Sequence, residues 1–318
     1  MRVIIGLALI FLLSACNKDS QVKEDIENLD LSVTIERFDM AFDKATPESF
    51  LELKENYPFL FSKQVEDSVY INRLNDSLQK IINSEIASAY PSESAINEDI
   101  ELLFKHLKYY DKTFKTPRVI TVSNRVDYRN KVVVTDSIVL IALDNYLGQD
   151  HEFYTNISKY IRQQFEADQV VVDLTDEYAK KRINSPFKKT LLAYMIDSGK
   201  RLYYKDVMIP FKTDAEKIGY TEEQLSWAQA NEANIWSYMI ENELLFSTDP
   251  KLVPTFINPA PFTKFGLPFD NESPGRLGEY IGWQIVKAYM TVNEVSLDQM
   301  LINNAEDIFN KSKFKPKK

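Results

Sequence analysis

The sequence is poor in the side chains that carry most nucleophilic and metal chemistry. Its 318 residues include one cysteine, Cys16, and two histidines, His106 and His151. A single thiol cannot form a disulfide within the chain. His151 and Glu152 match the first two positions of the zinc-peptidase motif H-E-x-x-H, but Thr155 stands where the second histidine would bind the metal. We therefore predict neither a metal nor a cofactor.

Basic charge and a phosphate-binding loop are also lacking. The chain has 38 Lys and Arg against 47 Asp and Glu, a formal net charge of -9. Nucleic acid requires a basic face, so we expect no nucleic-acid partner. The stretch Asp197-Ser198-Gly199-Lys200 lacks the first glycine and the following Ser or Thr of a phosphate loop. It is typical of a helix end or a point of tight packing.

The N-terminus carries an apolar run that is too short to cross a membrane. Residues 3–13 are apolar and follow a single arginine, so residues 1–15 have the pattern of a secretion signal. The stretch Leu13-Ser14-Ala15-Cys16 resembles a bacterial lipoprotein signal, in which the cysteine is acylated and becomes the new N-terminus. Asn17 is not the aspartate that retains many lipoproteins at the inner membrane. We therefore predict an outer-membrane anchor with the body facing the periplasm.

The pattern of charge and hydropathy divides the rest of the chain into three parts. Residues 16–30 form a polar, acidic tether, residues 31–310 a single globular domain, and residues 311–318, with five lysines, a solvated basic tail. Segments rich in Val, Ile and Thr predict strands over residues 31–38, 118–123, 131–134 and 137–143. From residue 156 onward the pattern is helical. The fold class predicted is α+β, predominantly helical.

Helix starts are marked by short polar signals. Proline follows a hydroxyl residue at Thr46-Pro47, Ser185-Pro186 and Ser273-Pro274, where its missing N–H costs nothing. Capping boxes occur at Thr221 with Gln224 and at Ser296 with Gln299. Apolar periodicity predicts long helices over residues 67–88, 94–110 and 222–245.

The most informative segment of the body is residues 273–290. Its three glycines, Gly275, Gly278 and Gly282, share one helical face. Each glycine inside a helix costs about 0.5–1 kcal/mol relative to alanine, so another backbone is expected to approach closely there. Arg276, Glu279 and Trp283 share a different side, where an ion pair could cover the indole. This side is either part of the core or the wall of a pocket.

The helix expected over residues 222–245 has two carboxylates, Glu232 and Glu243, in phase with its apolar stripe, which also contains Trp236. A carboxylate that faces a core must be paired or have a raised pKa, which is how general acids and bases are made. The same side chain at the edge of the stripe would point to water.

Several blocks of the sequence resemble a known family. They are the lipoprotein signal, residues 143–148 with Phe153-Tyr154, Ser198-Gly199-Lys200 leading into Tyr203, the helix around Glu232 and Trp236, Leu245-Phe246, Ala260-Pro261-Phe262 and residues 273–290. Together they are similar to the gliding-motility lipoprotein family GldB of Bacteroidota. The resemblance implies a cell-envelope lipoprotein required for gliding, a process coupled to type IX secretion. That family is distantly similar to predicted zincin-like peptidases, from which this chain departs at the metal ligands. The resemblance, with this departure, implies an inactive, peptidase-like scaffold.

Three functional hypotheses follow. The first is a non-enzymatic lipoprotein that binds a component of the gliding or secretion machinery in an aromatic-lined groove, with Glu232, Trp236, Arg276, Glu279, Trp283 and Tyr203 as candidate residues. The second is an envelope hydrolase with a carboxylate pair, for example Glu232 with Asp168 or Asp173. The third is a module that binds peptide or glycan by stacking on Tyr203, Tyr204, Trp227, Trp236 and Trp283.

Overall fold

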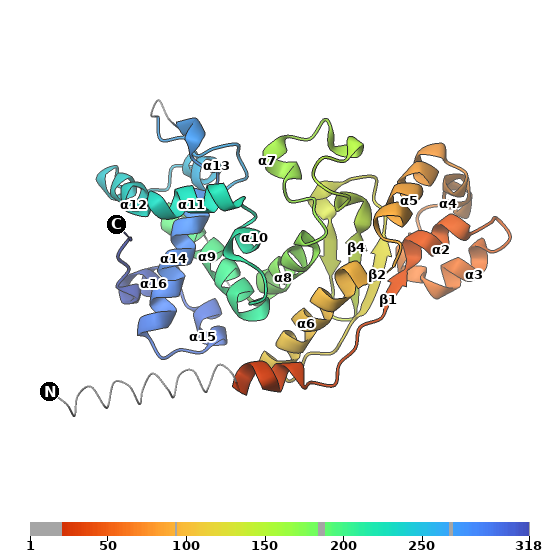
Figure 1. Cartoon of the computed structure of the whole chain (residues 1–318), viewed down its shortest axis with the longest axis horizontal. Coiled ribbons are helices and arrows are strands. Elements are labelled where there is room, and N and C mark those ends of the chain that lie inside the picture. The colour runs from red at the N-terminus through yellow and green to blue at the C-terminus, as the bar shows by residue number, and fades with distance from the viewer. Residues whose placement is uncertain (1–20, 93, 184–187, 267–269, 318) are drawn as a thin grey trace.

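A four-stranded mixed sheet forms the centre of the N-terminal half of the computed structural model, which describes residues 21–92, 94–183, 188–266 and 270–317 (Figure 1). The strand order is β1 (Ile35–Arg37), β2 (Arg118–Val122), β4 (Ile138–Ala142), β3 (Val132–Val134). The first three are parallel, and β3 pairs with β4 in the antiparallel sense. Three strands are thus confirmed. The strand expected over residues 31–38 is shorter: residues 31–34 lie outside it, and the chain enters a helix at Phe38.

Helices α2 (Phe38–Lys44), α3 (Phe50–Asn56), α4 (Asp67–Leu74), α5 (Ser77–Ala89) and α6 (Ser94–Tyr110) separate β1 from β2. The single helix expected over residues 67–88 is wrong: it breaks after Leu74, where the Asp76 side chain accepts the backbone N–H of Gln79 and caps α5. Phe42, Phe50, Leu53, Phe61 and Leu74 form a small cluster of their own, here called the aromatic cluster.

The C-terminal half is helical, which confirms the predicted fold class. Its helices are α7 (Lys159–Arg162), α8 (Gln169–Arg182), α9 (Leu191–Met208), α10 (Asp214–Ile218), α11 (Glu222–Ala230), α12 (Glu232–Glu241), α13 (Leu252–Phe256), α14 (Leu277–Val292), α15 (Leu297–Ile302) and α16 (Ala305–Ser312). Helix α8 lies against β3, α9 against α8, and α14 against α9. The sheet is therefore linked to the C-terminal helices through α8 and α9 (Figure 1).

The helix signals in this half have mixed outcomes. The capping boxes at Thr221 and Ser296 are confirmed. The helix expected over residues 222–245 is wrong, because it is interrupted at Asn231, whose side-chain amide donates to the carbonyl of Trp227. Ser273-Pro274 does not start a helix: α14 begins at Leu277, and the Ser273 hydroxyl donates to the carbonyl of Thr263. Ser185-Pro186 lies outside the described residues.

Helices α9 and α14 cross with their backbones in contact, and this contact is here called the glycine crossing. A Cβ atom on Gly282 would overlap the carbonyl oxygen of Met195, and one on Gly199 would overlap the carbonyl of Gly282. Cβ atoms on Gly275 and Gly278 would meet the carbonyl oxygens of Ala260 and Phe256. The close backbone approach expected for the three glycines of residues 273–290 is confirmed, as is tight packing at Gly199. The single helical face expected for the three is wrong, because Gly275 lies before the start of α14.

Both ends of the described chain pack against the body. Residues 21–27 are helical and Ile26 is 3% exposed, although the sequence predicts a solvated tether there. The tail predicted to be solvated lies against α12 instead: the Phe314 ring contacts Trp236, and the backbone N–H of Lys317 donates to Glu232. These contacts form because each segment contains an apolar residue among its charges. Across the described ranges, every helix is too short or too polar to cross a membrane.

Candidate functional site: a charged cavity between α8, α9 and α14

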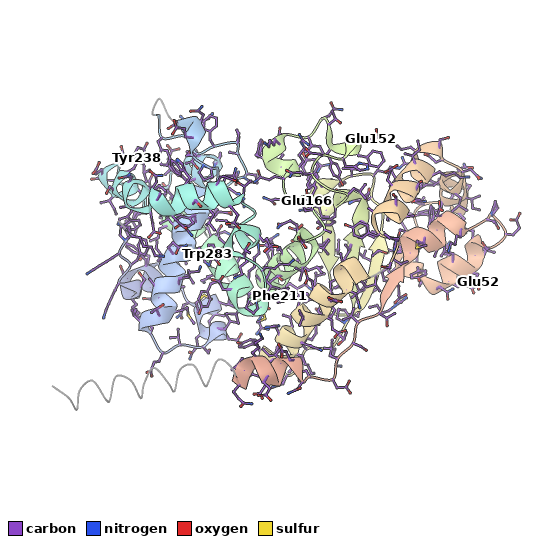
Figure 2. The ribbon with its side chains drawn as sticks, in the orientation of Figure 1. Glu52, Glu152, Glu166, Phe211, Tyr238 and Trp283 are labelled. Atoms are coloured by element: carbon purple, nitrogen blue, oxygen red, sulfur yellow. The ribbon has the colours of Figure 1, made fainter. Side chains whose placement is uncertain are left out.

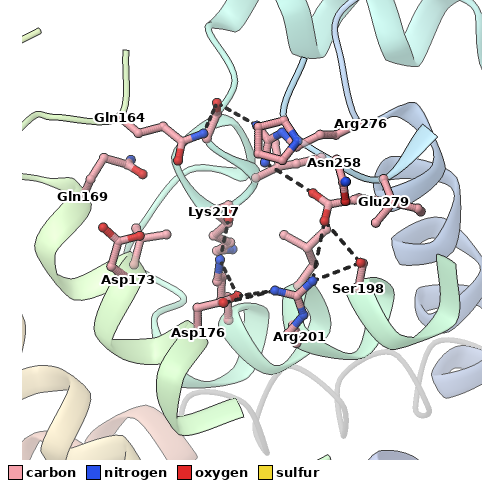
Figure 3. Close-up of a pocket in the computed structure, with 17 residues that line it drawn as sticks. Gln164, Gln169, Asp173, Asp176, Ser198, Arg201, Lys217, Asn258, Arg276 and Glu279 are labelled. Carbon is pink, nitrogen blue, oxygen red and sulfur yellow. Dashed lines mark hydrogen bonds and ion pairs between the residues drawn. The ribbon is translucent and has the colours of Figure 1, made fainter. Parts of the chain in front are cut away.

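A cavity of about 330 Å³ lies between helices α8, α9, α10 and α14 (Figure 3). Its charged lining residues are Asp173 and Asp176 of α8, Arg201 and Lys205 of α9, Lys217 of α10, and Arg276 and Glu279 at the start of α14. The rest of the wall consists of amide, hydroxyl and backbone groups and of apolar side chains: Gln164, Gln169, Ser198, Gly219 and Asn258, and Val172, Leu202, Ile218, Ile257 and Pro259. The cavity is therefore mostly polar, which distinguishes it from the core around it.

Helical spacing brings the charged side chains to one place. Asp173 and Asp176 are three residues apart on α8, and Ser198, Arg201 and Lys205 are three and four apart on α9. Residues at these spacings lie on one face of a helix. Because α8 and α9 pack side by side, the two faces meet across the cavity.

Asp176 is the centre of the ion-pair network on this wall. Its carboxylate lies 3.1 Å from a guanidinium nitrogen of Arg201, 3.2 Å from Nζ of Lys205 and 3.1 Å from Nζ of Lys180. Burial alone would raise the pKa of Asp176, but the charges of Lys205 and Arg201 lower it well below its usual range. Asp176 is therefore ionised at neutral pH.

Glu279 joins two helices by accepting from both. Its carboxylate is 3.3 Å from Nη1 of Arg276 and 3.5 Å from Nη2 of Arg201, and it also accepts the hydroxyl of Ser198 at 3.2 Å. Figure 3 shows Arg201 between Asp176 and Glu279, with Ser198 beside them. The network thus extends from α8 through α9 to α14.

Arg276 is held in an unusual backbone conformation. Its φ is 61°, in the left-handed region that non-glycine residues seldom adopt. Its guanidinium donates to the carbonyl of Gly219 at 3.1 Å and lies 5.2 Å from the ring centre of Tyr220. Gly219 is itself left-handed at the end of α10, with φ 69°. The contacts of the Arg276 guanidinium with the Gly219 carbonyl and with the Tyr220 ring therefore offset the strain of the Arg276 backbone.

The side chains that line the cavity carry one more positive than negative charge, four cations against three carboxylates. Asp173 pairs with Lys131, and Lys217 pairs with Asp206 at 3.1 Å; these partners do not line the cavity. The remaining lining charges are the cations Arg201, Lys205 and Arg276 and the carboxylates Asp176 and Glu279. The wall of this cavity therefore carries a small excess of positive charge, although the chain as a whole is acidic.

Of the six candidate groove residues, the structure places only Arg276 and Glu279 in the cavity wall. Trp283 is fully buried (Figure 2), and its indole N–H donates to Asp206 at 2.7 Å. The ion pair of Arg276 and Glu279 does not cover this indole. Nζ of Lys287 does, at 3.6 Å from the ring centre. Both expected environments of this side of α14 are therefore present, pocket wall at its start and core one turn later.

The other three candidates lie elsewhere. Glu232 is buried and accepts the Tyr280 hydroxyl at 2.8 Å and the backbone N–H of Lys317 at 2.9 Å, so it is paired structurally. Trp236 packs on Phe314. Tyr203 is half-buried outside the cavity, and burial raises the pKa of its hydroxyl. The six candidate residues therefore do not form the expected aromatic-lined groove.

The carboxylates and histidines named as alternatives are also separate. Asp173 lines the cavity, whereas Glu232 does not, and the Asp168 side chain is 71% exposed and pairs with Lys212. His151 caps a short 3-10 helix, Glu152–Tyr154, and its Nε2 is 3.2 Å from Glu85. Within the described ranges, no group of three or more His, Cys, Asp or Glu side chains is placed to hold a metal ion.

Sequence reasoning missed Asp176, Arg201, Lys205 and Lys217. The available signal was the spacing Asp-x-x-Asp on α8 and Ser-x-x-Arg-x-x-x-Lys on α9. In the sequence, Lys200 stands out only as part of the pair Gly199-Lys200. It is buried within α9, not at a helix end, and donates to the carbonyl oxygens of Leu301 and Asn303 at 2.9 and 2.6 Å.

Comparison with known proteins gives one family. A family model described as "Gliding motility protein GldB" matches residues 19–316, nearly the whole chain. Searches of curated proteins and of solved structures each found no match.

Proposed function

The chain belongs to the GldB family of gliding-motility proteins, and from this premise we propose that it is a non-enzymatic lipoprotein of the cell envelope that binds a component of the gliding machinery in the charged cavity. Cys16 carries the acyl chains, and the body faces the periplasm from the outer membrane. The partner is a protein of the gliding apparatus or of the type IX secretion system coupled to it.

The excess of one positive charge on the cavity wall is the observation that carries this proposal. Arg201, Lys205 and Arg276 are held in place by the two carboxylates Asp176 and Glu279. Such fixed cations suit an acidic side chain or the carboxylate at a chain end, because guanidinium groups bind carboxylates in a planar fork. The cavity volume, about 330 Å³, accommodates a few side chains rather than a folded domain.

The ionisation of Asp176 favours a role in binding over one in acid–base catalysis. A general acid or base works best with a pKa near the operating pH. The pKa of Asp176 is lowered away from that range, after the charges of Lys205 and Arg201 overcome the effect of its burial. The inactive, peptidase-like scaffold that the family resemblance implies stays a prediction.

Photo-crosslinking in gliding cells tests the proposal. Asn258 is exposed at the cavity and is a suitable position for p-benzoylphenylalanine. We expect capture of a motility or secretion component from position 258 and none from the exposed position 52 on α3, at the opposite end of the molecule from the C-terminal helices (Figure 2). Recovery of envelope fragments alone, or the same adducts from both positions, would contradict the proposal.

A pair of substitutions at the same position isolates the charge. Asn258→Glu adds a carboxylate that competes with the partner for the cations, whereas Asn258→Gln keeps the amide. For this test the photo-crosslinker stands at a second lining position, such as Gln164. We expect Asn258→Glu to reduce both the amount of crosslinked product and colony spreading at least fivefold. Asn258→Gln should leave both unchanged. Equal spreading of the two strains at equal protein abundance would count against an anionic ligand.

A further inference from the structure

The N-terminal segment of the described chain is docked on the body. Residues 21–27, here called the docking segment, are helical and bury Ile26 to 3% exposure. Val22 and Ile26 line one side of a second cavity, of about 740 Å³. The other side is formed by the C-terminal part of α6, which ends at Tyr110, and by the end of α9 with Pro210 and Phe211 after it. Figure 1 shows this segment beside the lower end of α6.

Docking shortens the free chain between an anchor at Cys16 and the body. Cys16 and Gln21 are five residues apart, which fully extended span at most about 18 Å. Without docking, the first residue held by the body would be Leu31, which packs against the core fifteen residues from Cys16, and the connection could reach about 54 Å. On the shorter connection, fewer surfaces of the body can face the membrane that holds the anchor.

The surface next to the docking segment has the chemistry of a membrane interface. Tyr110 is 42% and Phe211 38% exposed, the latter labelled beside the end of α6 in Figure 2. Nζ of Lys112 lies 4.8 Å from the ring centre of Tyr109, and Lys115 is exposed nearby in sequence. Aromatic rings with a polar edge and lysines with flexible stems are the residues enriched at the headgroup level of membranes.

We propose that this edge, formed by residues 109–115 and 210–211, faces the phospholipid headgroups of the membrane that holds Cys16, and that the docking segment keeps it there. The inference rests on the proposed acylation of Cys16 and adds the orientation of the body. On this orientation, the acyl anchor and the docking segment act together: one supplies the affinity for lipid, and the other selects the surface that contacts it.

Lipid crosslinking measures the orientation directly. In the full chain in cells, p-benzoylphenylalanine replaces Phe211 or, as a matched control, Phe246, which is 56% exposed and lies outside the cavity beside the docking segment. After irradiation, mass spectrometry of the purified protein quantifies phospholipid adducts. We expect at least tenfold more adduct at position 211 than at position 246.

Undocking the segment tests its role. Ile26→Asp places a charge at the buried position, and Asn28→Asp adds the same charge at an exposed one. We expect Ile26→Asp to reduce lipid adducts at position 211 at least fivefold, and Asn28→Asp to leave them unchanged. Undiminished adducts in Ile26→Asp would overturn the role of the segment. A second variant, with fifteen Gly and Ser residues inserted before Gln21, is expected to reproduce the loss without altering the buried position.

The mass of the N-terminal peptide distinguishes failure of the proposed lipid anchor from failure of the proposed orientation. An acylated Cys16 with equal adducts at positions 211 and 246 would overturn the orientation while leaving the lipoprotein assignment in place. A Cys16 that carries no acyl chain would overturn the proposed anchor and the orientation with it.

Discussion

The glycine crossing and the aromatic cluster are both buried, but they are held together by different means. At the crossing, the backbones of α9 and α14 touch, since Gly199 and Gly282 leave no room for a side chain. In the aromatic cluster, side chains fill the space: the rings of Phe50 and Phe61, for example, meet edge to face at 5.4 Å. A backbone contact cannot relax by changing a rotamer, whereas packed rings can adjust in part.

The two regions also differ in what they support. Ser198 and Arg201, which line the charged cavity, flank Gly199, and Glu279 is one turn before Gly282. A shift at the crossing therefore moves two walls of the cavity. The aromatic cluster joins α2, α3 and α4 on the other side of the sheet from the C-terminal helices (Figure 1). Its loss is expected to stay local.

The largest predicted effect is that of Gly282→Ala. Helix propensity alone would make alanine about 1 kcal/mol better than glycine, but the new Cβ overlaps the carbonyl of Met195 and forces α9 and α14 apart. We expect the free energy of unfolding, measured by urea denaturation, to fall by about 4 kcal/mol or more. Ala288→Gly in the same helix is the control and should cost about 1 kcal/mol. A Gly282→Ala protein as stable as the wild type would show that the helices separate freely.

A smaller and more local loss is expected for Phe50→Ala. Phe50 is fully buried in the aromatic cluster, and truncation of such a ring costs about 3 kcal/mol. Hydrogen exchange should show faster exchange for the amides of residues 38–74 and unchanged protection in α9 and α14. If protection fell equally in all of these helices, the cluster and the crossing would belong to one cooperative unit, and the contrast between them would be wrong.

Local signals account for the parts of the fold that the sequence predicts correctly. The strands β2, β3 and β4 follow from Val, Ile and Thr content, and the capping boxes at Thr221 and Ser296 from the hydrogen-bonding capacity of four consecutive residues. The backbone contact at Gly282 follows from glycine spacing. In each case the energetic preference is contained in the segment itself.

The incorrect boundaries depend on contacts that a segment does not contain. The apolar periodicity continues through Asn75-Asp76 and through Asn231, so it does not reveal that a side chain there bonds to the backbone and interrupts the helix. The strand expected over residues 31–38 covers only Ile35–Arg37, because its pairing with β2 runs only from Val119 to Thr121. Thr121 is on another strand, and local reasoning cannot supply it.

The same distinction applies to the cavity. Arg276 and Glu279 were found because they neighbour the informative glycines, whereas Asp176 and Arg201 were not found. Charges three or four residues apart are common on solvated helices, and only the packing of α8 on α9 turns this pair inward. Glu232 shows a related case, since its apolar phase leaves burial and exposure both open, and the choice is made by partners outside its helix, Tyr280 and the backbone of residue 317.

The smallest predicted effect concerns a buried charge next to the glycine crossing. Lys200 is 1% exposed, and burial lowers the pKa of its ammonium group to about 8, against about 10.4 for an unfolded chain. Between these values the unfolded state binds more protons, so the contribution of Lys200 to the free energy of unfolding increases as the pH rises. From pH 7 to 9.5, the stability of the wild type relative to Lys200→Met should rise by about 1–2 kcal/mol.

Taking the difference between the two proteins removes the titration of groups that they share, including tyrosines whose pKa is raised by burial, such as Tyr204. The exposed Lys315→Met is the control and should show no such pH dependence. A flat difference for Lys200→Met would mean that the carbonyl oxygens of Leu301 and Asn303 hold the ammonium charged over the whole range. In that case the hydrogen bonds of Lys200 would fix this part of α9 as firmly as the glycine crossing does. Burial of the amine would then not lower the free energy of unfolding at any pH in this range.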